Sequence, residues 1–335
     1  MKKLKMILSW IALSLILQCG VLFFLDKFYF KDNTDVNMEQ VAINNNHTNT
    51  NMHVQIPTNA KDIKVSYDGR YISYYENYSL EVCDTTSGDI KPLKDSDGRE
   101  ILRSVWLQDR NMLLTLEVED NQIVLYNYEP QKGVNQKIVD ICPYNASYKN
   151  FDIQASTITG VTYVRVNNAI YRVDINQNFA TNVPLTVRSL GSVSIMPTKD
   201  RLVYISKNGT IVHMTQPNER VPMNSKEPIE ILGIDEDGYM YLGEVKDNLV
   251  NGIIKKSLEN IDAKSEKIAL DKSVDKKDIF INGKGDIYVN YSNKGIVKNI
   301  KSSKETKYKG KFISYYNDGV SSILDGKYYK TTFSK

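Results

Sequence analysis

The chain has 335 residues, of which 41% are hydrophobic and 25% are charged, and its formal net charge is +3. This composition is typical of a globular protein, excludes a disordered or collagen-like chain, and gives no reason from charge alone to expect nucleic-acid binding. Three cysteines exclude a disulfide-dense scaffold and a zinc site of four cysteines, and three histidines leave few candidates for metal or acid–base chemistry.

The N-terminal segment combines a basic start with a long apolar run. Lys2, Lys3 and Lys5 precede residues 6–25, which contain no charged side chain. About 20 apolar residues are enough to cross a bilayer as a helix, and lysines before such a run favour a cytoplasmic N-terminus. We therefore expect a cytoplasmic tail (1–5), a transmembrane signal anchor (6–25) and an extracytoplasmic remainder, in a single-pass protein of the cell membrane.

Two other interpretations of this segment fit it less well. A cleaved signal peptide has a shorter apolar core and a small-residue exit site, whereas this run continues through Phe24 and Leu25 without one. A lipoprotein would be cut before Cys19, but Gln18 is a poor substitute for the small residue needed before the cut. The uncleaved anchor fits the segment best.

The next segment, residues 26–53, is rich in asparagine, and its sparse apolar residues follow no pattern. Such a segment cannot bury enough surface to offset the entropy lost on ordering it. We expect a flexible stalk, in which His47 and His53 are solvated linker residues rather than metal ligands.

From residue 54 to residue 335 short apolar runs alternate with turn residues. Runs rich in Val, Ile, Tyr, Leu and Thr end at Gly, Asn, Asp or Pro, as in 71–75, 122–128 and 201–206. This alternation is the signature of short strands joined by turns. Asp-Gly and Asn-Gly pairs, which favour tight hairpins, occur at residues 68–69, 97–98, 208–209, 237–238, 251–252, 282–283, 318–319 and 325–326.

The turns recur inside a repeating unit of turn, strand, loop and strand. The units lie at 65–93, 105–126, 157–171, 197–214, 235–252, 282–297 and 312–329. Their centres are roughly 35–50 residues apart, a period that indicates repeat architecture and propeller blades in particular.

The first unit contains a recognisable series: Ser66, Tyr67, Asp68, Gly69, Arg70, Ile72 and Tyr74, followed by Asp84, Ser87, Gly88 and Leu93. In these residues it resembles a repeat of the WD40-like propeller family, found in the C-terminal domain of TolB and the N-terminal propeller of dipeptidyl peptidase IV-type enzymes. Tyr67 stands where that family has proline. The resemblance implies a propeller over residues 54–335, but the family's functions are too varied to transfer.

Closure into a ring would protect the edges of these sheets from aggregation. At about 40–45 residues a blade, residues 54–335 hold six or seven blades. The C-terminal end offers three strands, at 311–315, 320–324 and 327–332, and residues 53–57 could supply the fourth. We expect an all-β fold with one seven-bladed propeller; six blades or tandem β-sandwiches are the alternatives.

The propeller region lacks the motifs of the common catalytic classes. It has no Gly-x-Ser-x-Gly elbow, His-Glu-x-x-His motif, Walker loop or dinucleotide fingerprint. His213 alternates with apolar residues and is expected to be structural. Asp235-x-Asp237-Gly238 resembles the start of a calcium loop, but Lys246 takes the twelfth position, where such a loop needs Glu. We expect no catalytic residue, no bound metal and no cofactor.

Two cysteines of the propeller region, Cys83 and Cys142, could pair in an oxidising exterior. The sequence cannot place their Cα atoms within the limit of about 7 Å that a disulfide requires. We expect two buried free thiols.

Charge is unevenly distributed along the propeller region. Residues 255–311 contain 15 lysines and 8 acidic residues, so this part is basic and the remainder slightly acidic. A solvated lysine face is one interpretation, and binding of an anionic envelope polymer or of lipid headgroups is the other. Trp106, Lys276 and Lys277 are candidate binding residues.

These observations favour a membrane-anchored, non-enzymatic propeller that serves as an interaction platform for a membrane or cell-wall protein of a bacterial envelope, with no nucleic-acid partner. One alternative is a propeller enzyme that binds a cofactor or metal through carboxylates at the channel mouth. Another is an envelope sensor or assembly factor coupled through its anchor. Three or more carboxylates converging at the mouth would favour the enzyme, and a tyrosine-lined face would favour the platform.

Overall fold

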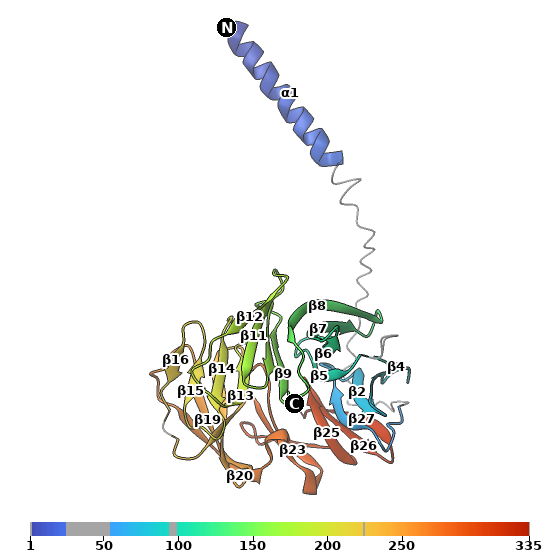
Figure 1. Ribbon diagram of the computed structural model, residues 1–335, viewed down its shortest axis with the longest axis vertical. Helices are drawn as coiled ribbons and strands as arrows, with labels where there is room; N and C mark the ends of the chain where they lie inside the picture. The colour runs from blue at the N-terminus through green and yellow to red at the C-terminus, as the bar shows by residue number, and fades with distance from the viewer. Residues whose placement is uncertain (1, 25–53, 94–98, 224, 335) are drawn as a thin grey trace. The chain divides into compact units, whose positions relative to one another are not determined.

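The computed structural model describes residues 2–24, 54–93, 99–223 and 225–334 (Figure 1). The chain divides into two compact units, Met1–Asn46 and His47–Lys335. The stalk expected over 26–53, with His47 and His53, lies outside the described residues.

The first unit contains helix α1 (Lys2–Phe24), which begins among the N-terminal lysines and continues through the apolar run. Within the described residues, no helix combines the length and the apolar character that crossing a membrane requires. The transmembrane span expected over 6–25 is therefore not supported by the structure.

The described residues 54–334 form a seven-bladed β-propeller, in which strands that follow one another in sequence pair within antiparallel sheets (Figure 1). Blades 1 to 3 consist of β1 (Lys61–Val65), β2 (Tyr71–Glu76), β3 (Ser79–Asp84) and β4 (Ile90–Pro92); β5 (Ile101–Trp106), β6 (Leu113–Glu119), β7 (Gln122–Glu129) and β8 (Val134–Pro143); and β9 (Phe151–Ser156), β10 (Val161–Val166), β11 (Ala169–Asp174) and β12 (Ala180–Val183). Blades 4 to 6 consist of β13 (Leu190–Ile195), β14 (Leu202–Ser206), β15 (Val212–Met214) and β16 (Glu219–Val221); β17 (Ile229–Ile234), β18 (Tyr239–Lys246), β19 (Leu249–Ser257) and β20 (Glu266–Val274); and β21 (Ile279–Ile281), β22 (Ile287–Tyr291), β23 (Ile296–Asn299) and β24 (Glu305–Lys307). Blade 7 holds β25 (Lys311–Tyr316), β26 (Gly319–Leu324) and β27 (Lys327–Thr332).

The start of the propeller region closes the ring. Residues 54–56 lie along β27, where Gln55 pairs with Lys327 and the Ile56 N–H donates to the carbonyl oxygen of Gly326 at 2.8 Å. The fourth strand position of blade 7 is thus filled by residues from the N-terminal end of the propeller region. The sequence predicted both this closure and the number of blades, and the structure excludes tandem β-sandwiches.

A hydrophobic cluster fills each interface between neighbouring blades in the described residues. Side chains alternate between the two faces of a strand, and both faces of a blade pack on neighbours, so the central strands are apolar on both sides. The cluster between blades 7 and 1 contains Val54, Ile56, Tyr74 and Tyr328. The hydrophobic core is therefore divided into seven clusters, one between each pair of neighbouring blades.

Polar contacts join the first strands of neighbouring blades in the wall of the central channel. The Lys64 ammonium donates to the carbonyl oxygen of Ser104 at 2.7 Å, and Arg103 pairs with Asp152 at 3.5 Å. Similar contacts join later blades: Ile231 N–H to Ser192 Oγ, Lys276 to Glu230, and Tyr315 OH to the Asp278 carbonyl. The wall is lined with charged groups that already have partners.

Among the predicted turns in the described part of the chain one is wrong, and the turn predicted at 97–98 lies outside that part. Asn251 and Gly252 lie inside β19, where Gly252 pairs with Glu244 of β18. The hairpin turns instead at Asp247 and Asn248, whose φ angles are 52° and 62°. Aspartate and asparagine tolerate this left-handed conformation better than most residues, so they form the turn without glycine.

Candidate functional site

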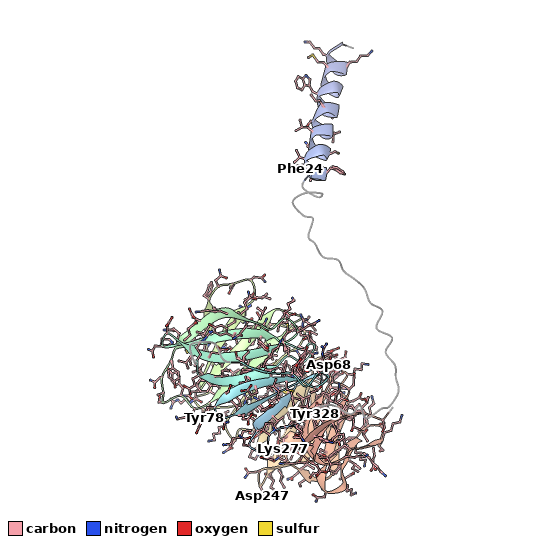
Figure 2. The ribbon with its side chains drawn as sticks, turned by 90° about the vertical axis from the view of Figure 1, so that its right-hand side faces the viewer. Phe24, Asp68, Tyr78, Asp247, Lys277 and Tyr328 are labelled. Atoms are coloured by element: carbon pink, nitrogen blue, oxygen red, sulfur yellow. The ribbon has the colours of Figure 1, made fainter. Side chains whose placement is uncertain are left out.

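The loops of the propeller lie on two opposite faces because adjacent strands run antiparallel. The mouth face is the end of the propeller that carries the loops between the first and second strands and between the third and fourth strands of each blade. We call connection face the end that carries the other loops, including those that link consecutive blades. Asp68 lies on the mouth face, whereas Tyr78, Asp247 and Lys277 lie on the connection face (Figure 2).

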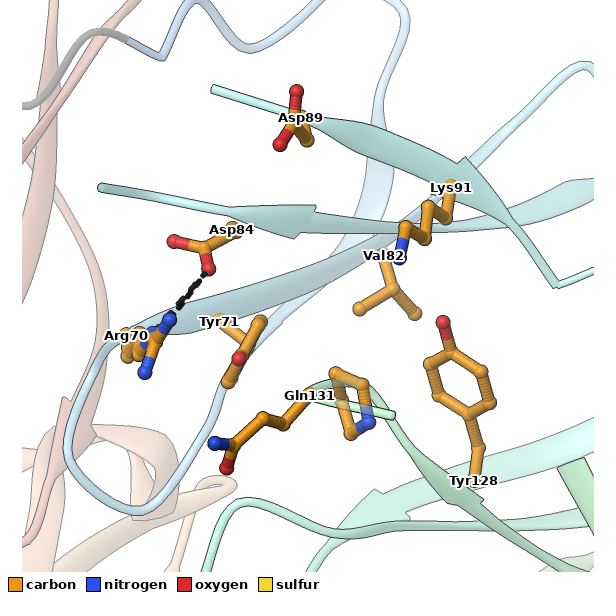
Figure 3. A pocket seen from close by; sticks show the side chains of 9 residues that line it. Arg70, Tyr71, Val82, Asp84, Asp89, Lys91, Tyr128 and Gln131 are labelled. Carbon is orange, nitrogen blue, oxygen red and sulfur yellow. Dashed lines mark hydrogen bonds and ion pairs between the residues drawn. The ribbon is translucent and has the colours of Figure 1, made fainter. Parts of the chain in front are cut away.

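A groove opens between blades 1 and 2 on the mouth face (Figure 3). It consists of two adjoining cavities of about 200 and 260 Å³ that share Arg70, Tyr71 and Gln131. Tyr71 and Tyr128 are almost fully buried and form part of its floor, and burial raises the pKa of both phenols. Charged and amide side chains therefore surround a groove floor that contains two tyrosine rings.

Arg70 is held at the edge of this groove by two contacts. Its guanidinium pairs with Asp84 at 3.2 Å and lies 5.2 Å from the centre of the Tyr71 ring (Figure 3). Burial acts to raise the pKa of Asp84, but the hydrogen bond from the Thr86 N–H and the charge of Arg70 outweigh it and lower the pKa. Asp84 thus stays ionised and fixes Arg70.

Lys91 differs from the other two cations of the groove. Arg70 pairs with Asp84 and Arg110 pairs with Asp109, but the ion pairs of the described residues give Lys91 no partner. Lys91 is exposed, and no ion pair with another described residue holds its ammonium. Among the described residues, the side chains that line the groove include no histidine or cysteine.

Four carboxylates of the mouth face act on the Tyr67 side chain. Partial burial raises the pKa of the Tyr67 phenol, and the negative charges of Asp318, Asp109, Asp68 and Glu236 raise it further. These carboxylates come from the loops of blades 7, 2, 1 and 5. In the described part of the chain, however, no three His, Cys, Asp or Glu side chains lie close enough to hold a metal ion together.

The acidic turn at Asp235 has a structural role. One Asp235 carboxylate oxygen accepts from the Tyr239 N–H at 2.7 Å and the other accepts from the Tyr241 hydroxyl at 2.9 Å. The carboxylate is almost fully buried. It fastens the loop between β17 and β18, in agreement with the expectation of an acidic turn.

The three candidate binding residues do not meet in one site. Trp106 is 7% exposed, stacks with Tyr71 at 6.3 Å between ring centres and donates to Ser73 Oγ at 3.0 Å, so it lies in the core behind the groove. Lys276 and Lys277 lie on the connection face. A binding role for any of them remains a prediction.

Sequence reasoning missed the groove itself. Arg70, Tyr71 and Lys91 belong to the first repeat, although Tyr71 and Lys91 are not among its recognisable residues, and Gln131 comes from the next blade. The conformational signal was the Asp68–Gly69 turn, which places Arg70 at the mouth face; Gly69 adopts a φ of 72° there.

Both cysteines of the propeller region are free thiols. Cys83 is fully buried, which raises its pKa to about 12, and Cys142 is partly buried with a pKa raised for the same reason. A thiol with a raised pKa is a poor nucleophile at neutral pH.

His213 lies in β15, buried as the sequence predicted, with its ring stacked on Tyr204 at 5.2 Å. Its Nδ1 is 3.0 Å from Thr186 Oγ1. Burial lowers the pKa of His213, and the charge of Arg220 lowers it further. The folded protein therefore disfavours the imidazolium.

We expect the free energy of unfolding to fall as the pH drops below about 6.5, the pKa of histidine in the unfolded chain. Below that value the unfolded chain binds a proton that the folded chain resists, at a limiting slope of about 1.4 kcal/mol per pH unit. Urea titrations at a series of pH values between 7.5 and 5 measure the free energy of unfolding. His213→Gln should flatten this part of the curve, and an unchanged slope would contradict the prediction.

No family model matches this chain, and no curated protein matches it by sequence. A chain in the crystal structure of the mitotic checkpoint complex has a TM-score of 0.55 at 10% identity, over 87% of this chain and 96% of that one. Oligogalacturonate lyase in complex with manganese has a TM-score of 0.54 at 12% identity, over 83% and 90%. The more specific resemblance to the WD40-like family is not confirmed. What the comparisons and the topology show is a β-propeller with seven blades.

Proposed function

We propose that this chain is a non-enzymatic interaction module that binds a protein partner on its mouth face. The groove between blades 1 and 2 is the observation that carries the proposal. It is shallow and combines buried tyrosines with both signs of charge, which is the mixture found where proteins recognise polypeptide segments. The ammonium of Lys91 would meet an acidic side chain of that partner.

We further propose that residues before the propeller attach it to the cell membrane, with the propeller outside. The support comes from the sequence: Lys2, Lys3 and Lys5 precede the uncharged run 6–25. By the positive-inside rule this order places the following domain outside the cytoplasm. In this arrangement the partner is a membrane or cell-wall protein.

A second candidate function is a propeller enzyme that binds a metal or cofactor at the channel mouth. The carboxylates of four blades around Tyr67 are the observation that favours it. They are too far apart for any three described donors to share one ion. The interaction module therefore ranks first.

The test is site-specific photocrosslinking of the full-length chain in its native cells. A photoreactive residue replaces Gln131 in the groove or, as a matched control, Lys304, which is exposed on the mouth face of blade 6. We expect one abundant protein adduct from position 131 that is absent from position 304. Lys91→Glu should reduce this adduct by about tenfold, the effect of losing roughly 1.4 kcal/mol of charge–charge attraction.

Two results would overturn the proposal: no protein adduct at position 131, or the same set of adducts at both positions. Mass spectrometry of the adduct identifies the partner. An adduct at position 131 that survives Lys91→Glu unchanged would show that the partner occupies the groove without the charge–charge contact to Lys91.

A further inference from the structure

The connection face carries a concentration of lysines on blades 5 and 6 and on the loop that enters blade 7. We call this the lysine patch; its members are Lys246, Lys276, Lys277, Lys294, Lys307, Lys309 and Lys311. They lie in or at the ends of the segments 246–249, 275–278, 292–295 and 307–311. The acidic residues of the same segments are Asp247, Asp275 and Asp278.

The topology brings two of these segments together and places all four on the connection face. Pairing of β23 with β24 places Ile296 opposite Lys307, and the Tyr308 N–H donates to the Gly295 carbonyl at 3.0 Å. The turn that carries Lys294 therefore lies beside the loop 307–311. Lys277 and Asp247 lie on the same side of the propeller in Figure 2.

Most of the positive charge of the patch is not neutralised within the protein. Lys276 pairs with Glu230 at 2.9 Å and Lys277 pairs with Asp275 at 3.3 Å. The ion pairs of the described residues leave the others without a partner, and all of them are exposed: Lys246, Lys294, Lys307, Lys309 and Lys311. The patch is therefore a cationic surface available to an external anion.

The remaining acidic groups do not compensate for these lysines. The Asp278 carboxylate is partly buried and accepts from Asn290 Nδ2 at 2.7 Å, and burial raises its pKa. Asp275 accepts from the Lys277 N–H at 3.0 Å, which fixes it at the start of a short helical turn. The Asp275 carboxylate is thus engaged within its own loop, and the Asp278 carboxylate is engaged by Asn290 of β22.

We propose that the lysine patch binds a linear phosphate polymer that runs across blades 5 and 6. Lysine ammonium groups act as point charges that suit phosphate. Five unpaired lysines spread over several loops fit a ligand with many charges better than a single phosphate, since linked weak contacts reinforce one another. Leu249, with 38% of its surface exposed, is the large apolar side chain exposed in the described segments of the patch. The surface therefore has little apolar area to insert into a bilayer.

This inference is independent of the groove, because the patch and the groove lie on opposite faces. A partner on the mouth face and a polymer on the connection face can be bound at the same time. Failure of one proposal leaves the other untouched.

The experiment uses the full-length chain in a non-ionic detergent and fluorescently labelled long-chain polyphosphate as the probe. Fluorescence anisotropy measures the affinity over a range of salt concentrations. We expect the triple variant K307Q/K309Q/K311Q to bind about tenfold more weakly or worse and to depend less on salt, because fewer counterions are released. The matched control is K264Q/K301Q/K304Q, which removes equal charge from exposed positions on the mouth face of the same two blades; it should change the affinity less than about twofold.

Several outcomes would overturn the proposal. Equal weakening in both triple variants would show that net charge, not the patch, binds the probe. Displacement of polyphosphate by the same total concentration of inorganic phosphate would indicate a site for one phosphate. Binding to phosphatidylglycerol vesicles without binding to polyphosphate would assign the patch to a lipid surface, and tighter binding to double-stranded DNA would assign it to nucleic acid. Circular dichroism checks that each variant is folded.

Discussion

Replacing Ile56 by alanine is expected to lower the free energy of unfolding of the propeller by about 2–5 kcal/mol. Ile56 is 5% exposed and packs with Tyr74 and Tyr328 in the cluster between the first and last blades. Truncating it leaves a cavity in the interface that closes the ring. The stability of a whole domain is about 5–15 kcal/mol, so this change alone removes a large share of it.

Gln55 provides the matched control for this prediction. It lies in the same closing segment and pairs with Lys327, but its side chain is exposed. Gln55→Ala should shift the free energy of unfolding by less than about 0.5 kcal/mol. Urea denaturation followed by circular dichroism measures both variants. If the two substitutions had the same small effect, residues 54–56 would not hold the ring closed.

Replacing Trp106 by alanine is expected to cost about 3–5 kcal/mol of stability. The indole is buried, stacks with Tyr71 and donates a hydrogen bond to Ser73 Oγ. Its loss opens a cavity behind the groove and removes the support of the Tyr71 ring, so we also expect a weaker crosslink from position 131.

Trp106→Phe distinguishes a packing role from a binding role. Phenylalanine keeps most of the aromatic contact with Tyr71 and loses the hydrogen bond to Ser73, so its effect should be clearly smaller than that of alanine. If Trp106→Ala left stability unchanged but abolished partner binding, Trp106 would act as a binding residue and not through packing. Thermal unfolding and the crosslinking yield, measured on the same preparations, separate the two cases.

The position of the closing segment links the fold to the proposed attachment. Residues 54–56, which pair with β27, directly follow the residues that we propose to connect the propeller to the membrane. A force applied to the N-terminus would therefore act first on this segment. The buried side chains of Val54 and Ile56 and the backbone hydrogen bonds to Gly326 and Tyr328 hold this segment in the ring.

The sequence by itself predicted a series of short strands in repeating units and favoured seven blades over six, and the structure has seven. The turn residues and apolar runs are local features, and strands 311–315, 320–324 and 327–332 were predicted almost to the residue. Closure of the ring by the start of the propeller region followed from counting the expected strands, since the last blade lacked a fourth one. The turn at 251–252 was misplaced because Asp247 and Asn248 adopt the left-handed conformation equally well in their context.

Only the tertiary structure decided which side chains are available to a ligand. In a propeller both faces of a blade are covered, so alternation along β5 could not show whether Trp106 points to solvent. The groove joins Arg70 to Gln131 of the next blade. Successive loops leave opposite faces, so the lysine-rich stretch 255–311 is divided: Lys264 and Lys301 lie on the mouth face and Lys277 and Lys309 on the connection face. The composition shows that lysines are in excess in this stretch, but the antiparallel path of the chain decides which of them lie on the same face.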